Sequence, residues 1–160
     1  MNQTFLKSLT FIVLSSFLQA SGSLLDEIES LGTLTQVPKM HLAKGSKATN
    51  NPRAIYFDAL PYEGKNTRSY AWLGLPRKTA GKVPGVVLVH GGGGTAYKEW
   101  VQHWNRNGFA AISIAVEGQT DRKISKEGQK KAWEKHQWAG PSRVGVFGDS
   151  NKELKNQWMY

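Results

Sequence analysis

The sequence contains no cysteine among its 160 residues. This absence excludes a disulfide framework, a metal site built on thiolates and a lipidated cysteine. Because no covalent cross-link is available, the fold has to be stabilised by a packed core.

The motif that usually carries a catalytic serine is also absent. No position begins GxSxG, the strained turn between a strand and a helix that exposes a nucleophilic serine. A P-loop is excluded because no GK[ST] stands at the required spacing. The histidines His41, His103 and His136 have no partners at the spacing of metal ligands, so we expect no metal site.

Acidic residues are scarce, with 12 Asp and Glu against 21 Lys and Arg, and the formal net charge is +9. Much of the excess lies in residues 122–135, which we interpret as a solvated loop or insertion. No aromatic ladder or recognised nucleic-acid motif accompanies this stretch, so we do not expect nucleic-acid binding.

Long hydrophobic runs are missing as well. The apolar stretch 9–18 is too short for a permanent membrane anchor. It follows Lys7 and precedes small residues at Ala20 and Gly22, which is the pattern of a secretory signal. We therefore predict a signal peptide over residues 1–22 and a secreted or periplasmic protein. The alternative is a buried N-terminal helix.

After the signal, residues 23–53 are expected to form a surface lead-in, with one short helix that Gly32 ends. The apolar positions on one face of this helix are Leu24, Leu25, Ile28 and Leu31. Strands are predicted over residues 54–59 and 67–75, with Pro76 closing the second, and a turn at 63–66 makes them an antiparallel hairpin.

The spacing of apolar residues changes in the next segment. Residues 86–89 are continuously apolar, as in a strand of a parallel sheet that is covered on both faces. Thr95 is predicted to cap a following helix that Asn107 and Gly108 end, and residues 109–116 form the next buried strand. The apolar stripe of the helix, expected to face the sheet, comprises Tyr97, Trp100, Val101 and Trp104. The order strand, glycine turn, helix, strand predicts one βαβ unit.

The turn between this strand and this helix reads HGGGG. Glycine permits positive φ and leaves main-chain N–H groups uncovered, so the turn can hold a negatively charged oxygen. Gly92 and Gly93 are the predicted oxyanion donors. Gly91 and Gly94 support the loop, and His90 is expected to brace it by hydrogen bonding.

Two other chemistries stay open at this point. Gly91, Gly93 and Ala96 fit GxGxxA, and Glu117 ends the second strand where an NAD(P)-binding fold holds the ribose. The sequence Gly-Asp-Ser at 148–150 is similar to the nucleophile block of GDSL-type hydrolases, but we interpret Ser150 as a loop residue.

The six tryptophans suggest a third hypothesis, a noncatalytic module that binds carbohydrate. Two of them, Trp100 and Trp104, are assigned to the core by the helical stripe. The roles of Trp72, Trp133, Trp138 and Trp158 stay open.

The hairpin, VVLVHGGGGT, the amphipathic helix and GFAAISIAVEG together resemble the opening half of an α/β-hydrolase. GPSRVGVFGDS and the terminal QWMY resemble the secreted bacterial acetyl xylan esterase and dienelactone hydrolase-like group. The resemblance covers residues 54–160 and implies an α/β domain that hydrolyses carboxylic esters without a cofactor. Its substrate would be an ester, with acetylated polysaccharide among the candidates, and the oligomeric state stays open.

In such relatives the GxSxG serine, the acid and the histidine of the triad follow the segment that ends here at Tyr160. We therefore expect the 160 residues to be the N-terminal half of a hydrolase, inactive alone. In that arrangement the strand 86–89 would be interior. With an open edge it is expected to make the chain poorly soluble.

Overall fold

The computed structural model describes residues 24–62, 64–77, 81–125 and 131–140. The chain divides into two units, residues 1–35 and 36–160. The predicted signal peptide, Ser150 and Trp158 lie outside the described residues.

The described part of the first unit contains helix α1, Leu24–Leu31. It ends at the predicted place, because the N–H of Gly32 donates to the carbonyl of Glu29 at 3.1 Å. None of the described helices is both long and apolar enough to cross a membrane.

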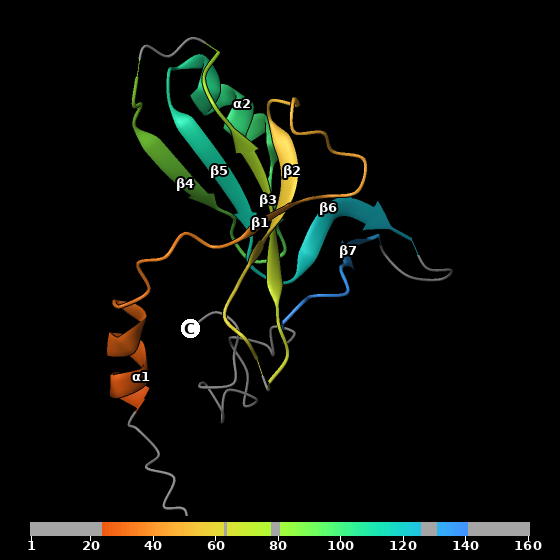
Figure 1. The fold of residues 1–160 in the computed structure, drawn as a ribbon. Coiled ribbons are helices and arrows are strands. Elements are labelled where there is room, and N and C mark those ends of the chain that lie inside the picture. The colour runs from red at the N-terminus through yellow and green to blue at the C-terminus, as the bar shows by residue number, and fades with distance from the viewer. Residues whose placement is uncertain (1–23, 63, 78–80, 126–130, 141–160) are drawn as a thin grey trace, which may run out of the picture. The chain divides into compact units, whose positions relative to one another are not determined.

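The second unit is built on a mixed five-stranded sheet in the order β1-β2-β3-β5-β4 (Figure 1). Only β4 and β5 are parallel, whereas the other neighbouring strands are antiparallel. The class is therefore α/β. The strands of this sheet are β1 Met40–Leu42, β2 Arg53–Asp58, β3 Arg68–Gly74, β4 Gly85–Val89 and β5 Ala110–Ala115.

The parallel pair is joined through helix α2, Lys98–Arg106, which confirms the predicted strand, turn, helix and strand. Asn107 caps the end of the helix and Gly108 follows with φ +86. The predicted start was wrong. Tyr97 is the N-cap, and the hydroxyl of Thr95 donates to the carbonyl of Thr120 at 2.9 Å. Thr95 is only 1% exposed, and the hydroxyl that would have capped the helix binds the carbonyl of Thr120 instead.

The predicted apolar stripe of α2 is also only partly right. Val101 is fully buried, but Trp100 is 40% exposed and its ring lies 4.6 Å from that of Tyr97. The helix approaches β3 so closely that a Cβ on Gly74 would lie 2.1 Å from Asn105 Oδ1. This close approach of α2 to β3 leaves room for the small side chain of Val101 between them, whereas the larger indole of Trp100 lies on the solvent side of the helix.

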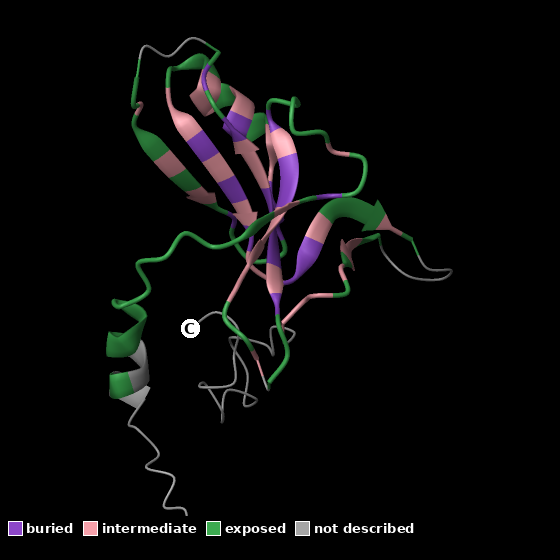
Figure 2. Cartoon of the chain, viewed as in Figure 1, coloured by how far each residue is buried: buried purple, intermediate pink, exposed green. Residues whose placement is uncertain are grey.

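Strand β4 was predicted to be covered on both faces, and for the described residues this is wrong. Val87 and Val89 are 63% and 56% exposed, whereas Val86 and Leu88 on the opposite face are partly covered (Figure 2). The described helix that contacts β4 is α2, and a single helix covers one face of a sheet, so the alternation of side chains along β4 leaves every second residue exposed on the other face.

Residues 122–135 were predicted to be a solvated loop or insertion, and for the described residues 122–124 and 132–135 the prediction of a loop is wrong. Strands β6 Gln119–Ile124 and β7 Ala132–Lys135 pair antiparallel as a separate two-stranded ribbon. Long polar side chains stabilise it across the strands. Arg122 forms an ion pair with Glu134, and the ammonium of Lys123 lies 4.7 Å from the ring of Trp133.

Candidate active site

The glycine turn lies directly after the carboxyl end of β4. The N–H of Gly94 donates to the carbonyl of Gly91 at 3.1 Å, so Gly92 and Gly93 are the two central residues of a β-turn. Gly93 has φ +76 and Gly92 is not in the positive region, which is the type II pattern. The turn therefore needs glycine at position 93 for conformational reasons.

The two central N–H groups remain available. Gly92 and Gly93 are both exposed, and no hydrogen bond among the described residues uses either main-chain N–H. These are the groups that the sequence predicted as donors to an oxyanion.

The side chain of His90 stabilises the turn by hydrogen bonding. Its side chain is buried, and ring Nδ1 lies 2.6 Å from the carbonyl of Gly91. Ring Nε2 accepts the N–H of Val116 at 3.2 Å and lies 3.1 Å from Nε2 of Gln119. Because Nε2 accepts, the proton of the neutral ring belongs on Nδ1, which donates to Gly91. Both nitrogens are thus engaged, and His90 positions the loop rather than serving as a free base.

The orientation of one donor follows from this contact. The carbonyl of Gly91 and the N–H of Gly92 belong to one planar trans peptide unit and point in opposite directions. Since His90 and the Gly94 N–H both bind the carbonyl, the N–H of Gly92 is directed away from them.

Gln119 completes the support and was missed by the sequence analysis. It is 2% exposed, its amide nitrogen donates to the carbonyl of Gly94 at 2.7 Å, and its oxygen accepts the N–H of Glu117 at 2.8 Å. Trp133, whose role was open, donates from Nε1 to the carbonyl of Gly93 at 2.8 Å. Both residues come from the ribbon, a polar segment in which no pattern distinguishes them.

Gly94 itself has no room for a side chain. A Cβ there would lie 2.8 Å from Cβ of His90 and 2.9 Å from Cγ and Nδ1 of its ring. Gly91, in contrast, has nothing within 4 Å of the corresponding position. The loop therefore packs tightly on one side and is open on the other.

The remaining sequence candidates lie apart from the turn. His41 is bound to Asp58 at 2.8 Å, and this hydrogen bond, together with Arg68, lowers the pKa of the Asp58 carboxyl. Ring contacts place His103 beside Trp104 and His136 beside Tyr56. No group of three or more potential metal ligands occurs in the part of the chain that the structure describes.

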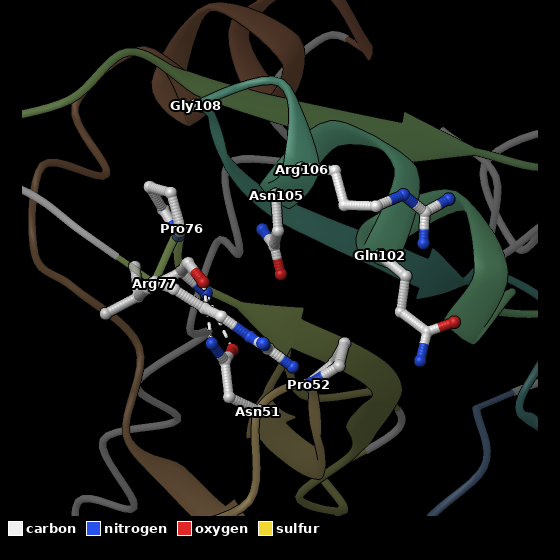
Figure 3. Close-up of a pocket in the computed structure, with 9 residues that line it drawn as sticks. Asn51, Pro52, Pro76, Arg77, Gln102, Asn105, Arg106 and Gly108 are labelled. Carbon is white, nitrogen blue, oxygen red and sulfur yellow. Dashed lines mark hydrogen bonds between the residues drawn. The ribbon is translucent and has the colours of Figure 1, made fainter.

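Among the described residues, two of the cavities lie near the sheet, and neither of these is lined by the glycine turn. One, of about 540 Å³, lies at the C-terminal end of α2, where the side chain of Asn51 bonds both main-chain groups of Leu75 (Figure 3). It contains none of the predicted site residues. The other, of about 990 Å³, is lined by residues of β2, β3 and the β6–β7 ribbon.

A family model described as Acetyl xylan esterase (AXE1) matches residues 26–146, a span that includes the whole mixed sheet, the glycine turn and the ribbon. No curated protein and no solved structure matches the chain.

Proposed function

The chain belongs to the acetyl xylan esterase family, and from this premise we propose that its glycine turn stabilises the oxyanion in the hydrolysis of a carboxylic ester. The observation that carries the proposal is that Gly92 and Gly93 are exposed at the end of a strand and ahead of a helix, and that their main-chain N–H groups form no hydrogen bond among the described residues. The family match favours this hydrolase over the NAD(P)-binding alternative.

The chemistry requires donors that are in place before the reaction begins. When a nucleophile attacks an ester carbonyl, its oxygen gains nearly a full negative charge, and one preset N–H contributes on the order of 3 kcal/mol to lowering the barrier. His90, Gln119 and Trp133 bind the carbonyls of the turn, so its peptide planes need little rearrangement. The structure of the turn thereby supports the proposed role.

The proposed reaction also needs a serine nucleophile, and a histidine that takes and returns its proton. The 160 residues contain no GxSxG, and both ring nitrogens of His90 are engaged. We therefore propose that the 160 residues alone do not hydrolyse esters. The proposal includes export, on the pattern of residues 1–22, and acetylated polysaccharide as the substrate class.

Gly92 offers a specific test of the donor. Proline is favoured at the second position of a type II turn and has no N–H, so Gly92→Pro removes the donor while keeping the turn. The 160-residue chain would be co-expressed with a polypeptide carrying the GxSxG, acid and histidine blocks of an AXE1 family member. We expect hydrolysis of p-nitrophenyl acetate by the pair, and a loss of about 10²-fold or more in kcat for Gly92→Pro.

Four results would contradict parts of this proposal. An inactive pair, or unchanged kcat for Gly92→Pro, would remove the oxyanion role. Turnover by the 160 residues alone, abolished by Ser150→Ala, would instead support a GDSL-type nucleophile. Saturable quenching of NADH fluorescence would support the dinucleotide alternative.

A further inference from the structure

The cavity of about 540 Å³ at the C-terminal end of α2 is lined by two arginines, and we call it the arginine cavity. Arg106 is the last residue of the helix, and Arg77 follows β3. Figure 3 shows Arg106 on the α2 side of this space and Arg77 on the side of Asn51 and Pro52. Among the described residues that line it, none is an aspartate, a glutamate or a lysine. The arginine cavity therefore concentrates positive charge.

Both guanidinium groups are available to a ligand. Arg77 and Arg106 are exposed, and neither side chain forms an ion pair, a hydrogen bond or a ring contact with a described residue. Arg68 and Arg122, in contrast, are each paired with a carboxylate. A guanidinium group binds the oxygens of a carboxylate or a phosphate through two parallel N–H donors. The arginine cavity thus offers two such groups to one anion.

The walls that carry the two arginines are held in place by hydrogen bonds. On one side, the side chain of Asn51 donates to the carbonyl of Leu75 at 2.6 Å and accepts the N–H of Leu75 at 2.9 Å. On the other side, Nδ2 of Asn105 donates to the carbonyl of Phe109 at 3.0 Å, which ties the end of α2 to the residue before β5. The cavity is therefore formed before a ligand enters it.

The end of the helix does not cancel this positive charge. The C-terminal end of a helix carries a partial negative charge of about half an elementary charge, which by itself disfavours an anion. Two guanidinium groups carry two full positive charges, so the net charge facing the cavity is positive. In addition, the carbonyls of His103, Trp104 and Asn105 already accept hydrogen bonds from residues 107–109, which reduces the negative potential of the helix end.

The charge and the lining of the cavity favour one class of ligand. Two guanidinium groups match the charge of a phosphate monoester, which is about −2 near pH 7.5. Leu75, which is 47% exposed, lines the same space beside Pro52 and Pro76 and offers apolar surface. A volume of about 540 Å³ lies in the range of small-molecule sites. An organic phosphate therefore fits the cavity better than the inorganic ion does.

The arginine cavity lies at the opposite end of the parallel strands from the glycine turn. The turn follows Val89 at the carboxyl end of β4. Gly108, which lines the cavity, leads into β5 at Ala110, and Ala110 pairs with Gly85 at the amino end of β4. The strand from Gly85 to Val89 spans roughly 13 Å. A ligand in the cavity therefore does not occupy the proposed ester site.

We propose that the arginine cavity binds a small organic phosphate. Its phosphate oxygens accept hydrogen bonds from Arg77 and Arg106, and its organic part contacts Leu75. This binding goes beyond the proposed function, because the site lies away from the glycine turn and no bond of the ligand is cleaved there.

The test uses the complete 160-residue chain and phenyl phosphate at low ionic strength, with calorimetric titration as the readout. We expect saturable binding that Arg77→Gln and Arg106→Gln each weaken by about tenfold or more. Lys39→Gln is the matched control, because it removes the same charge from an exposed residue that lines neither cavity. It should leave the dissociation constant within about twofold.

Three related probes test the class of ligand. Benzoate keeps the ring with a single negative charge, phenol keeps the ring without a full charge, and inorganic phosphate keeps the charge without the ring. We expect each to bind about tenfold more weakly than phenyl phosphate.

The urea midpoint separates lost binding from lost folding. Arg77→Gln and Arg106→Gln should keep the wild-type midpoint, because neither guanidinium group has a partner among the described residues. Arg106→Lys keeps the charge but loses the paired N–H donors, so it should give an intermediate dissociation constant. The proposal is overturned if the wild-type chain does not bind phenyl phosphate at about 10 mM, or if Lys39→Gln weakens binding as much as Arg77→Gln. Equally tight binding of benzoate, phenol or inorganic phosphate would overturn it too.

Discussion

A single methyl group at Gly94 tests the packing of the glycine turn. The φ of Gly94 lies outside the left-handed region, so alanine is compatible with its backbone and the available space decides the outcome. The added Cβ would lie 2.8 to 2.9 Å from three atoms of His90. His90 has little freedom to move, because both ring nitrogens are hydrogen-bonded.

The expected cost follows from these contacts. Overpacking in a well-packed site typically costs about 1–3 kcal/mol. If the ring shifts instead, it weakens hydrogen bonds worth about 1 kcal/mol each. We therefore expect Gly94→Ala to lower the free energy of unfolding by about 2–3 kcal/mol.

Two neighbouring glycines are internal controls. Gly93→Ala meets no atom within 4 Å but requires alanine at φ +76, which costs roughly 1–2 kcal/mol. Gly91→Ala meets neither obstacle and should change stability by less than about 0.5 kcal/mol. The order of destabilisation is thus predicted to be Gly94, then Gly93, then Gly91.

Urea unfolding followed by tryptophan fluorescence measures all three, with the free energy taken by linear extrapolation. If Gly94→Ala proves as stable as Gly91→Ala, the ring of His90 moves freely. The network would then not hold the turn, and the reasoning about preset donors would fail.

Three further outcomes are expected. Gln119→Leu should cost about 2–4 kcal/mol in the same assay because it leaves the buried carbonyl of Gly94 without its donor, and a cost below about 0.5 kcal/mol would contradict this. The pKa of His136 is lowered in the fold, so the unfolded chain binds more protons between about pH 4 and pH 6.5, and stability should fall as pH decreases through that window. His136→Phe should remove part of that decrease between about pH 7.5 and pH 5, and an identical pH dependence would refute the assignment. Replacing exposed Val87 and Val89 on edge strand β4 by threonine should raise the concentration that stays in the supernatant, whereas unchanged solubility would rule out this strand as the cause of aggregation.

Local patterns predicted much of the fold. The apolar run of β4, the helix after it and the apolar run of β5 were predicted within a few residues, and Gly32 and Gly108 follow the helices where expected. These features depend on the periodicity and backbone preferences of neighbouring residues, which a sequence displays directly.

Strand β1 and the ribbon could not be predicted in the same way. β1 has three residues and is defined by its pairing with β2, where His41 stands opposite Tyr56. The ribbon is a strongly polar segment in which Trp133 is the one aromatic residue of the two strands, and its strands are stabilised by pairing with each other. Such pairing depends on a partner distant in the chain, so composition alone favoured a loop.

The same distinction between local sequence and distant partners applies to the candidate site. The four glycines determined by themselves where the chain can present uncovered N–H groups, because the absence of a Cβ is a property of the residue. Only the tertiary structure decided which groups hold that turn, since Gln119 and Trp133 reach it from 25 and 40 residues along the chain. It also decided that β4 is an edge strand and that Arg77 and Arg106 line one cavity, because strand order and register, rather than local propensity, determine which segments come together.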